Sequence, residues 1–182
     1  DPIVLTSRDA LKQFLADPAQ NKSGNMAILG VPAIDLDRTN EGAEEAWNPE
    51  QTLHCTLNLG GCAFTGTTRF LQEVATSGSL INGSFRLTGT VDAAICQTNR
   101  GNLSYLSVSP ANPGTAEVQH ASATRAGLVV DNHGSISRCR SSLTVIGRAD
   151  GGTTPHYIGG IAARSVYDTD TQMPIIELCE VT

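Results

Sequence analysis

The amino-acid sequence predicts an all-β protein built as a single-stranded β-solenoid, with a short helix capping its N-terminal end. Three observations lead to this prediction. Part of the sequence repeats with a period of 33 residues, aromatic residues make up only 4% of the chain while glycine occurs 18 times, and only one segment has the pattern of an amphipathic helix. Abundant turn-forming residues and few large rings favour thin β layers over a helical bundle.

The length and charge of the chain narrow the possible partners. A chain of 182 residues suits one domain, which we expect to cover residues 1–182 and to be a fragment of a larger protein. The net charge is −6 and Lys and Arg are scattered, so the sequence has no basic stripe that would bind nucleic acid. No stretch approaches the ~18 apolar residues of a membrane span. We therefore expect no nucleic-acid partner and no membrane span.

The predicted helix lies in "LTSRDALKQFLADPAQ", within a cap and leader over residues 1–20. Thr6 or Ser7 can accept a hydrogen bond from a first-turn N–H, and Asp9 suits the positive end of the helix dipole. The apolar residues share one face: Ala10, Leu11, Phe14 and Leu15. The helix should end at Asp17, because a residue before proline avoids the α region.

After this helix the sequence is of β type. The stretch "NMAILGVPAIDLD" precedes a polar loop, "RTNEGAEEAWNPEQ", which holds the only tryptophan, Trp47. Short apolar runs follow, "TLHCTLNL" and "SLINGSFRLTGTV", separated by Gly, Ser and Asn. We expect no second helix of useful length and no linker between domains.

Residues 88–182 contain the clearest repeats. A shift of 33 residues places Asn99 on Asn132, Gly101 on Gly134 and Leu103 on Ile136. A second shift of 33 brings residues 127–130 onto 160–163, so that Gly160 and Ile161 open a third unit. The match lapses for seven residues and resumes at an offset of 40, where Ile136 and Cys139 meet Ile176 and Cys179.

Such a repeat predicts stacked units, because one unit cannot enclose its own apolar residues. Asn and Gly tolerate positive φ, so we expect Asn-x-Gly to form a tight corner, with His133 pointing outward at its rim. Ankyrin repeats share the 33-residue period, and "GTTPHYIGGIAA" faintly echoes their signature. The flanking segments, however, are rich in Gly, Ser and β-branched residues where an ankyrin unit requires two helices, so we set that alternative aside.

The stretches "AGLVVDNHGSISRCRSSLTVIG" and "IGGIAARS" resemble the glycine-rich "GLUG" repeats of bacterial surface and secreted proteins. The typical unit there reads Gly-Gly-Leu-Val-Gly, then Asn-x-Gly-x-Ile, then Cys. This chain departs from it at Val130 and Ala163, where the family often has glycine, and at Ser165, which replaces Asn. The resemblance implies a right-handed parallel β-helix used as a non-catalytic part of extracellular bacterial proteins.

Five cysteines leave at least one without an intrachain disulfide partner. Cys55 and Cys62 are close enough for a loop-closing bridge in an oxidising compartment. We expect Cys96, Cys139 and Cys179 to act as small buried apolar side chains. The redox state of all five stays open at this point.

The chemistry-bearing residues do not form a recognisable catalytic or metal site. The histidines show no metal-ligand spacing, so we expect neither a metal nor another cofactor. A polysaccharide-cleaving β-helix, the alternative function, would need converging carboxylates. The acidic candidates are Asp35 and Asp37 in "IDLD", Asp131 at a corner, and Asp168 with Asp170 in "DTD", where a weak Ca²⁺ contact stays possible.

These observations favour an extracellular, non-catalytic binding or structural module. We expect part of a bacterial adhesin, a pilus-associated protein or a phage receptor-binding protein that recognises a cell-surface glycan or protein. The expected recognition surfaces are the loops "SPANPGTAEVQHASAT" and "GRADGGTTPHY", because insertions in solenoids project from one side. The last strands would leave an open C-terminal edge, where we expect further chain, a partner subunit or a cap.

Overall fold

The structure of the protein, a computed structural model, describes residues 1–37, 47–89, 91–112, 117–118, 124–145, 157–167 and 173–182. These residues are mostly β-strand with one short helix, and every strand pair is parallel. The expectation of an all-β protein with parallel strands is confirmed.

Two sheets hold most of the described strands. The eleven strands of the larger one, the long sheet, are β1 (Ile3–Leu5), β2 (Met26–Leu29), β3 (Ala33–Asp35), β5 (Thr56–Asn58), β6 (Ala63–Gly66), β8 (Ser79–Leu87), β10 (Asn102–Pro110), β14 (Ser135–Ser137), β15 (Arg140–Ser141), β19 (Ile175–Glu177) and β20 (Glu180–Val181). The five strands of the other, the short sheet, are β4 (Thr52–Leu53), β7 (Leu71–Val74), β9 (Cys96–Asn99), β13 (Val129–Asn132) and β18 (Ala162–Ser165). Two small pairs complete the set: β11 (Glu117–Val118) with β16 (Thr144–Val145), and β12 (Thr124–Ala126) with β17 (Tyr157–Gly159).

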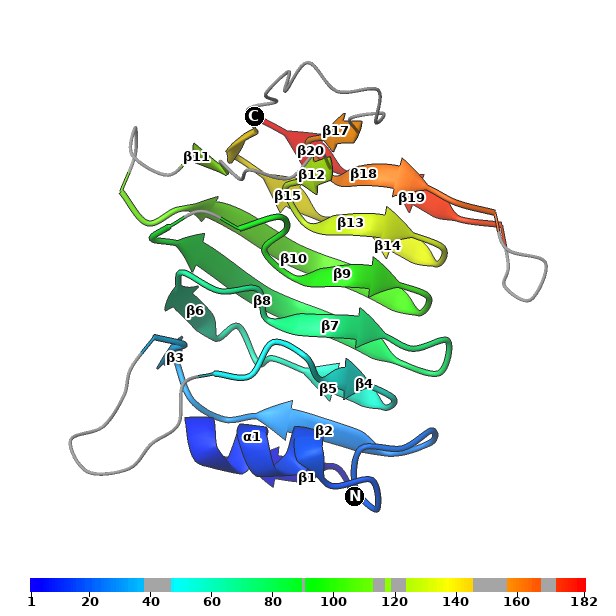
Figure 1. Ribbon diagram of the computed structural model, residues 1–182. Coiled ribbons are helices and arrows are strands. Elements are labelled where there is room, and N and C mark those ends of the chain that lie inside the picture. Colours follow the sequence, from blue (N-terminus) through cyan, green and yellow to red (C-terminus); the bar gives the residue numbers. More distant parts are fainter. Residues whose placement is uncertain (38–46, 90, 113–116, 119–123, 146–156, 168–172) are drawn as a thin grey trace.

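From β4 onward the chain alternates between these two sheets, so that each passage adds one level to both. We call each level a rung. The strands of the short sheet run in one direction across the molecule, and β8 and β10 of the long sheet run back in the opposite direction (Figure 1). Neighbouring strands of a sheet therefore belong to successive rungs.

The register of the later rungs matches the predicted offsets. Asn99 pairs with Asn132, and Leu103 pairs with Ile136, both at an offset of 33. Ile136 pairs with Ile176 at the offset of 40, and the seven extra residues therefore fall between β18 and β19. The repeat seen in the sequence is thus a repeat of stacked strands.

The first half of the chain forms rungs as well, although its sequence shows no 33-residue repeat. Ile3 pairs with Ala27 at an offset of 24, and Met26 pairs with Thr56 at an offset of 30. The next two rungs have offsets of 23, from Thr56 to Ser79 and from Ser79 to Asn102. Because these lengths differ from 33, a comparison at one fixed offset cannot detect them. The stacked region therefore starts at β1, well before residue 88.

Leucine and isoleucine fill the interior in columns. Leu57, Leu80, Leu103 and Ile136 are in register with one another, and each is fully buried. Four aromatic side chains gather in the first half, where Phe64, Phe70, Phe85 and Trp47 have neighbouring ring centroids 4.9–5.4 Å apart. The Trp47 indole N–H donates to the Phe70 carbonyl at 2.7 Å.

The predicted helix forms and closes the N-terminal end of this interior. Helix α1 (Arg8–Ala16) begins at Ser7, whose hydroxyl accepts a hydrogen bond from the Ala10 N–H at 3.0 Å. It ends at Asp17, as expected. Its apolar face buries Leu11, Phe14 and Leu15. The helix lies next to β1 and β2 (Figure 1).

The explanation by positive φ for the Asn-x-Gly corners is wrong. Among the described residues, the positive-φ positions do not include Asn99, Asn132, Gly101 or Gly134. Glycine is required there because the rungs approach closely. A Cβ atom at Gly134 would lie 2.2 Å from the Gly101 carbonyl oxygen, and one at Gly101 would lie 2.2 Å from the Gly78 carbonyl oxygen.

The asparagines at these corners point into the protein and bond to each other. Asn99 and Asn132 are fully buried, and the Asn99 side-chain amide donates to Oδ1 of Asn132 at 2.8 Å. The Asn132 amide donates in turn to the carbonyl oxygens of Gly134 at 3.1 Å and Ile175 at 3.5 Å. This two-step ladder ties three successive rungs together at one corner.

Positive φ occurs instead at a different corner, within the long sheet. In four successive rungs one residue takes it: Asn82, Tyr105, Arg138 and Leu178, which the strand register places above one another. Such a conformation is uncommon for residues other than glycine. Nothing in the sequence around Tyr105 or Leu178 indicates a positive φ, so this corner could be identified only from the structure.

Candidate functional site

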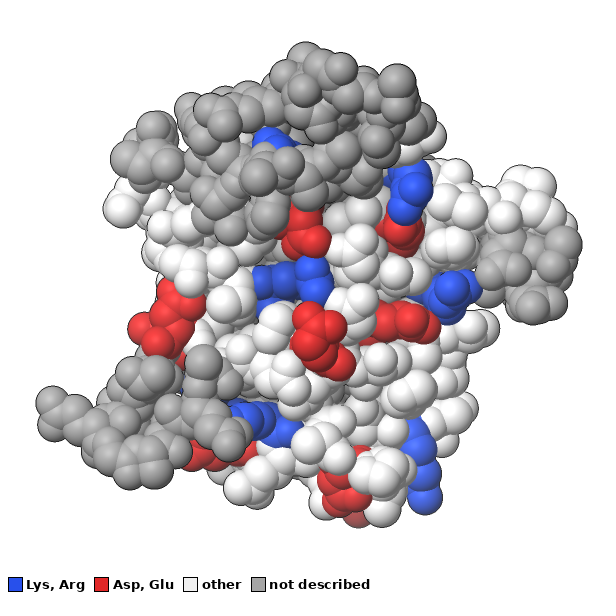
Figure 2. Space-filling model, in the orientation of Figure 1, with Lys and Arg blue, Asp and Glu red and all other residues white. Residues whose placement is uncertain are grey.

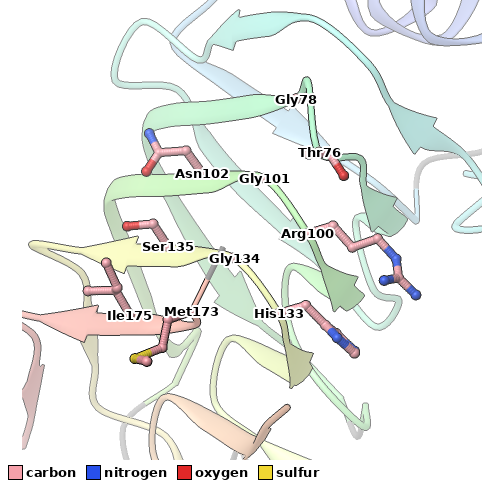
Figure 3. Close-up of a pocket in the computed structure, with 10 residues that line it drawn as sticks. All are labelled: Thr76, Gly78, Arg100, Gly101, Asn102, His133, Gly134, Ser135, Met173 and Ile175. Atoms are coloured by element: carbon pink, nitrogen blue, oxygen red, sulfur yellow. The ribbon is translucent and has the colours of Figure 1, made fainter. Parts of the chain in front are cut away.

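A groove runs across the rungs at the Asn-x-Gly corner. Its floor is the column of Gly78, Gly101 and Gly134, whose lack of side chains leaves a depression between two rows of side chains (Figure 3). Its volume is about 320 Å³. Since parallel strands are spaced about 4.8 Å apart, a groove crossing four rungs is roughly 14 Å long.

The two walls of the groove differ in chemistry. Thr76, Arg100 and His133 form one wall, and Asn102 and Ser135 form the other (Figure 3). The second wall continues over the last rung with the apolar side chains Ile175 and Met173. The groove is therefore polar along most of its length and apolar at its C-terminal end.

Arg100 and His133 are the two side chains of the groove that can carry positive charge. Arg100 is held by an ion pair with Glu73 of β7, at 3.4 Å between Nε and Oε1, with both side chains about one-third exposed. His133 is half-buried rather than pointing freely outward, and its Nδ1 is buried without a hydrogen-bond partner among the described residues. Both side chains lie beside the glycine floor, and the ion pair with Glu73 holds Arg100 in place.

The hydrogen bonds of the backbone keep the floor in register. Asn102, Ser135 and Ile175 each donate a backbone N–H to the floor glycine of the preceding rung, at 2.9–3.0 Å. The Asn102 side chain also bonds to the Ser79 hydroxyl at 3.2 Å, within the same wall. The groove therefore follows the turns that join the two sheets at this corner, and the backbone hydrogen bonds keep these turns in register.

The repeat residues identified from the sequence surround this groove. Gly101 and Gly134 form its floor, Asn99 and Asn132 support it from inside, and Leu103 and Ile136 lie in the core below. Cys139 is buried further along the same rung, and Gly160 and Ile161 lie at the start of the next. The repeat in the sequence identified these positions as structural. It did not indicate the groove, because the walls of the groove are formed by residues that do not repeat.

The acidic candidates do not converge. Asp37 accepts hydrogen bonds from the backbone N–H and hydroxyl of Thr67 at 2.9–3.0 Å, and Asp35 accepts one from the Asp37 N–H at 3.0 Å. Asp131 is bound by the Arg164 guanidinium, with Nη2 at 2.6 Å from Oδ2. This carboxylate raises the pKa of Arg164. These three carboxylates thus have structural partners, and Asp168 and Asp170 lie outside the described residues.

A partly buried arginine, Arg69, connects several side chains on the outer face of the short sheet, and the sequence gave no reason to select it. Arg69 is 13% exposed and bonds to Asp92 at 2.9 Å, to Gln72 at 2.6 Å and to the Leu71 carbonyl at 2.8 Å. Its second carboxylate partner, Glu50, lies at 3.4 Å. With this many protein partners, Arg69 serves to hold strands together.

The cysteines are free thiols, and four of the five are buried. Burial raises the pKa of Cys55 and of Cys62 to about 11, and that of Cys139 to about 12. No bridge joins Cys55 and Cys62, so the structure shows them as small apolar side chains. Cys179 is only partly buried, because no described rung lies beyond it.

The surface carries charges of both signs. Acidic and basic side chains are interspersed on the face shown in Figure 2, without a continuous patch of either sign among the described residues. Within the described chain there is also no cluster of three or more metal-ligating side chains, and no helix of the length and apolarity that a membrane crossing requires. The expected recognition loops, residues 109–124 and 147–157, lie largely outside the described residues.

Comparisons with known proteins were made at three levels. No protein-family model, no curated protein and no solved structure matches this chain.

Proposed function

We propose that this chain is a right-handed β-solenoid of the GLUG-like kind that acts as a rigid, non-catalytic binding module and holds an elongated glycan in the corner groove. The right hand is the one taken by nearly all crossovers between parallel strands. Support for the solenoid comes from six successive parallel steps of the long sheet, accompanied from β4 onward by four steps of the short sheet.

The single observation that carries the binding role is the shape and lining of the groove. It is open along the stacking direction, and its walls offer hydroxyl, amide, guanidinium and imidazole groups from successive rungs. A ligand that uses such a row must itself be extended and rich in hydroxyl or carboxylate groups, which describes a polysaccharide. Rigid walls favour binding, because little conformational entropy is lost when the ligand docks.

A cell-surface or extracellular role follows from this proposal. A regular stack of rungs separates its ends by a fixed distance and presents side chains on its outside, which suits a stalk or recognition part of an adhesin, a pilus-associated protein or a phage receptor-binding protein. The groove lining among the described residues includes no carboxylate, so the pair of acids that glycoside hydrolysis uses has no counterpart there.

A glycan array with the purified chain tests the proposal, followed by titration calorimetry with the best ligand. His133→Ala and Arg100→Ala should each weaken binding about tenfold, whereas His54→Ala and Arg86→Ala, at exposed positions that do not line the groove, should leave it unchanged. Equal losses in both sets, or no binding to any glycan, would contradict the proposal. The appearance of shorter products during incubation would replace it with a polysaccharide-cleaving enzyme.

A further inference from the structure

Tyr105 combines an exposed aromatic ring with a strained backbone. It lies on β10, is 56% exposed, and has a φ of 54°. A bulky residue with positive φ is an outlier, and such strain persists mainly where the position has a function such as holding a ligand. The same corner of the preceding rung carries Asn82 at a φ of 63°, and asparagine tolerates this conformation. The shape of the corner therefore does not explain why a tyrosine is present.

The ring of Tyr105 is held in one orientation by a neighbour on the next rung. The guanidinium carbon of Arg138 lies over the ring, 5.4 Å from its centroid, and Nη1 of Arg138 donates a hydrogen bond to the Tyr105 hydroxyl. These two interactions fix the ring, and Tyr105 nevertheless stays more than half exposed. Because the ring is already ordered, little conformational entropy is lost when a ligand packs on it.

A strip of uncharged polar side chains connects Tyr105 with the groove. Asn102 forms part of the groove wall, and Ser104 follows it on the same face of β10. Ser135 and Ser137 of β14 are in register with these two residues. Asn102 and Tyr105 are three residues apart, which is roughly 10 Å along a strand. A glycan of a few sugar residues that leaves the groove over this strip therefore reaches the ring.

We propose that Tyr105 is a further sugar-binding subsite of the groove, on which one pyranose ring of the bound glycan stacks. This inference rests on the glycan-binding function proposed above. A pyranose presents C–H groups on its ring faces and hydroxyl groups around its edge, so that it can pack on an aromatic ring and bond to polar neighbours at the same time. Arg138, whose side chain is exposed, adds hydrogen-bond donors beside the ring.

The composition of the strip favours a sugar over a protein as the occupant. Small hydroxyl and amide side chains lie between the groove and the ring, whereas the centre of a protein interface is apolar and rich in large side chains. The distance from the groove also makes the subsite dependent on ligand length, because only an oligosaccharide that extends beyond the groove can contact Tyr105. Length dependence is the property that an experiment can measure.

Titration calorimetry with two lengths of the same glycan tests the proposal. The probes are the trisaccharides and hexasaccharides of the cello-, chito- and galacturono-oligosaccharide series, of which the best binder is used. Tyr105→Asn should lower the affinity for the hexasaccharide roughly tenfold, a loss typical of an aromatic contact, and leave the affinity for the trisaccharide unchanged. Tyr105→Phe, which keeps the ring and removes only the hydroxyl, should retain most of the affinity for the hexasaccharide.

Two controls separate the subsite from a structural role. Tyr157→Asn should leave both affinities unchanged, because Tyr157 is also exposed, at 41%, and lies under Arg164 at 5.4 Å, but belongs to β17 and lines neither the groove nor the strip. In urea unfolding, Tyr105→Asn should be at least as stable as the unaltered chain, because asparagine accepts the positive φ at this corner, as Asn82 does. A loss of affinity in a variant of undiminished stability then reports on the ligand contact.

The possible outcomes distinguish this subsite from the groove itself. A hexasaccharide that loses affinity with His133→Ala but not with Tyr105→Asn would overturn the subsite and leave the groove as the binding site. An equal loss for the trisaccharide and the hexasaccharide, or a lower stability of Tyr105→Asn, would also overturn it, since Tyr105 would then act on the structure of the groove. If the unaltered chain binds none of these oligosaccharides, the glycan role of the groove and the subsite both fail.

Discussion

The stacking of rungs predicts that two isoleucines in the same column, on successive rungs, contribute very different amounts to the free energy of unfolding. Ile136 and Ile176 are in register, and both point into the interior. Ile136 is fully buried between Leu103 and Ile176, whereas Ile176 is 42% exposed because no described rung covers it. Replacement of each by alanine removes the same atoms from two different environments.

The expected losses can be derived from burial. Ile136→Ala leaves a cavity enclosed by neighbouring rungs, which costs about 2–5 kcal/mol. Ile176→Ala removes only part of a buried surface and leaves no enclosed cavity, so that its cost should be roughly 1 kcal/mol. Ile136→Asp should be at least as damaging as Ile136→Ala, because it buries an unpaired carboxylate.

Urea unfolding followed by circular dichroism measures these free energies, at a protein concentration low enough to exclude association. The slope of the transition should stay the same in all variants, so that the midpoints can be compared directly. Equal losses for the two alanine variants would show that the assigned column does not exist. An Ile136→Asp variant as stable as the parent would refute the register itself.

Three further predictions concern the corners and the buried thiols. Asn132→Ala should lower the free energy of unfolding by about 1–3 kcal/mol for each buried group left without a partner, including the Asn99 amide. Gly134→Ala should cost about 1–3 kcal/mol because its Cβ would clash with a carbonyl oxygen, whereas Gly30→Ala, whose Cβ meets nothing closer than 3.6 Å, should cost little. Stability should fall as the pH rises from about 9 toward 11, because burial raises the pKa of thiols such as Cys62 from 9.0 to about 11 and the unfolded chain loses those protons first.

Each of these predictions has its own control. The asparagine and glycine variants are compared by urea unfolding, and an equal loss at Gly30 and Gly134 would show that close approach of the rungs is not the reason for glycine. Thermal unfolding between pH 7 and pH 11 measures the effect of the thiols, whose contribution is about 1.4 kcal/mol per thiol and pH unit within that window. Cys62→Ala should reduce this slope, and an unchanged slope would exclude the thiol as its source.

The sequence was sufficient to predict the local features that depend on residues close together in the chain. The helix and its start at Ser7 follow from a hydroxyl before an apolar face, and the structure places both as expected. The rungs of the second half follow from a repeat of equal length, because equal segments bring identical residues into register. Asn99 and Asn132 could be paired on that basis alone, and their side chains are 2.8 Å apart.

The sequence was insufficient to predict the stacking where the length of chain from one rung to the next varies. The first rungs, with offsets of 24, 30 and 23, follow no single period, and their stacking is decided by which apolar side chains, such as Leu57 and Leu80, can share an interior. The reason for glycine at Gly134 was also misjudged, since the distance to a carbonyl of the neighbouring rung is not encoded in any short motif.

The sequence by itself determined that this chain is made of β-strands, that its second half stacks in a known register, and that a helix closes one end. These properties depend on spacing along the chain, which a sequence contains. Only the tertiary structure decided where the groove lies and that glycine is needed on its floor because successive rungs approach closely. Those properties depend on which residues of different rungs lie side by side.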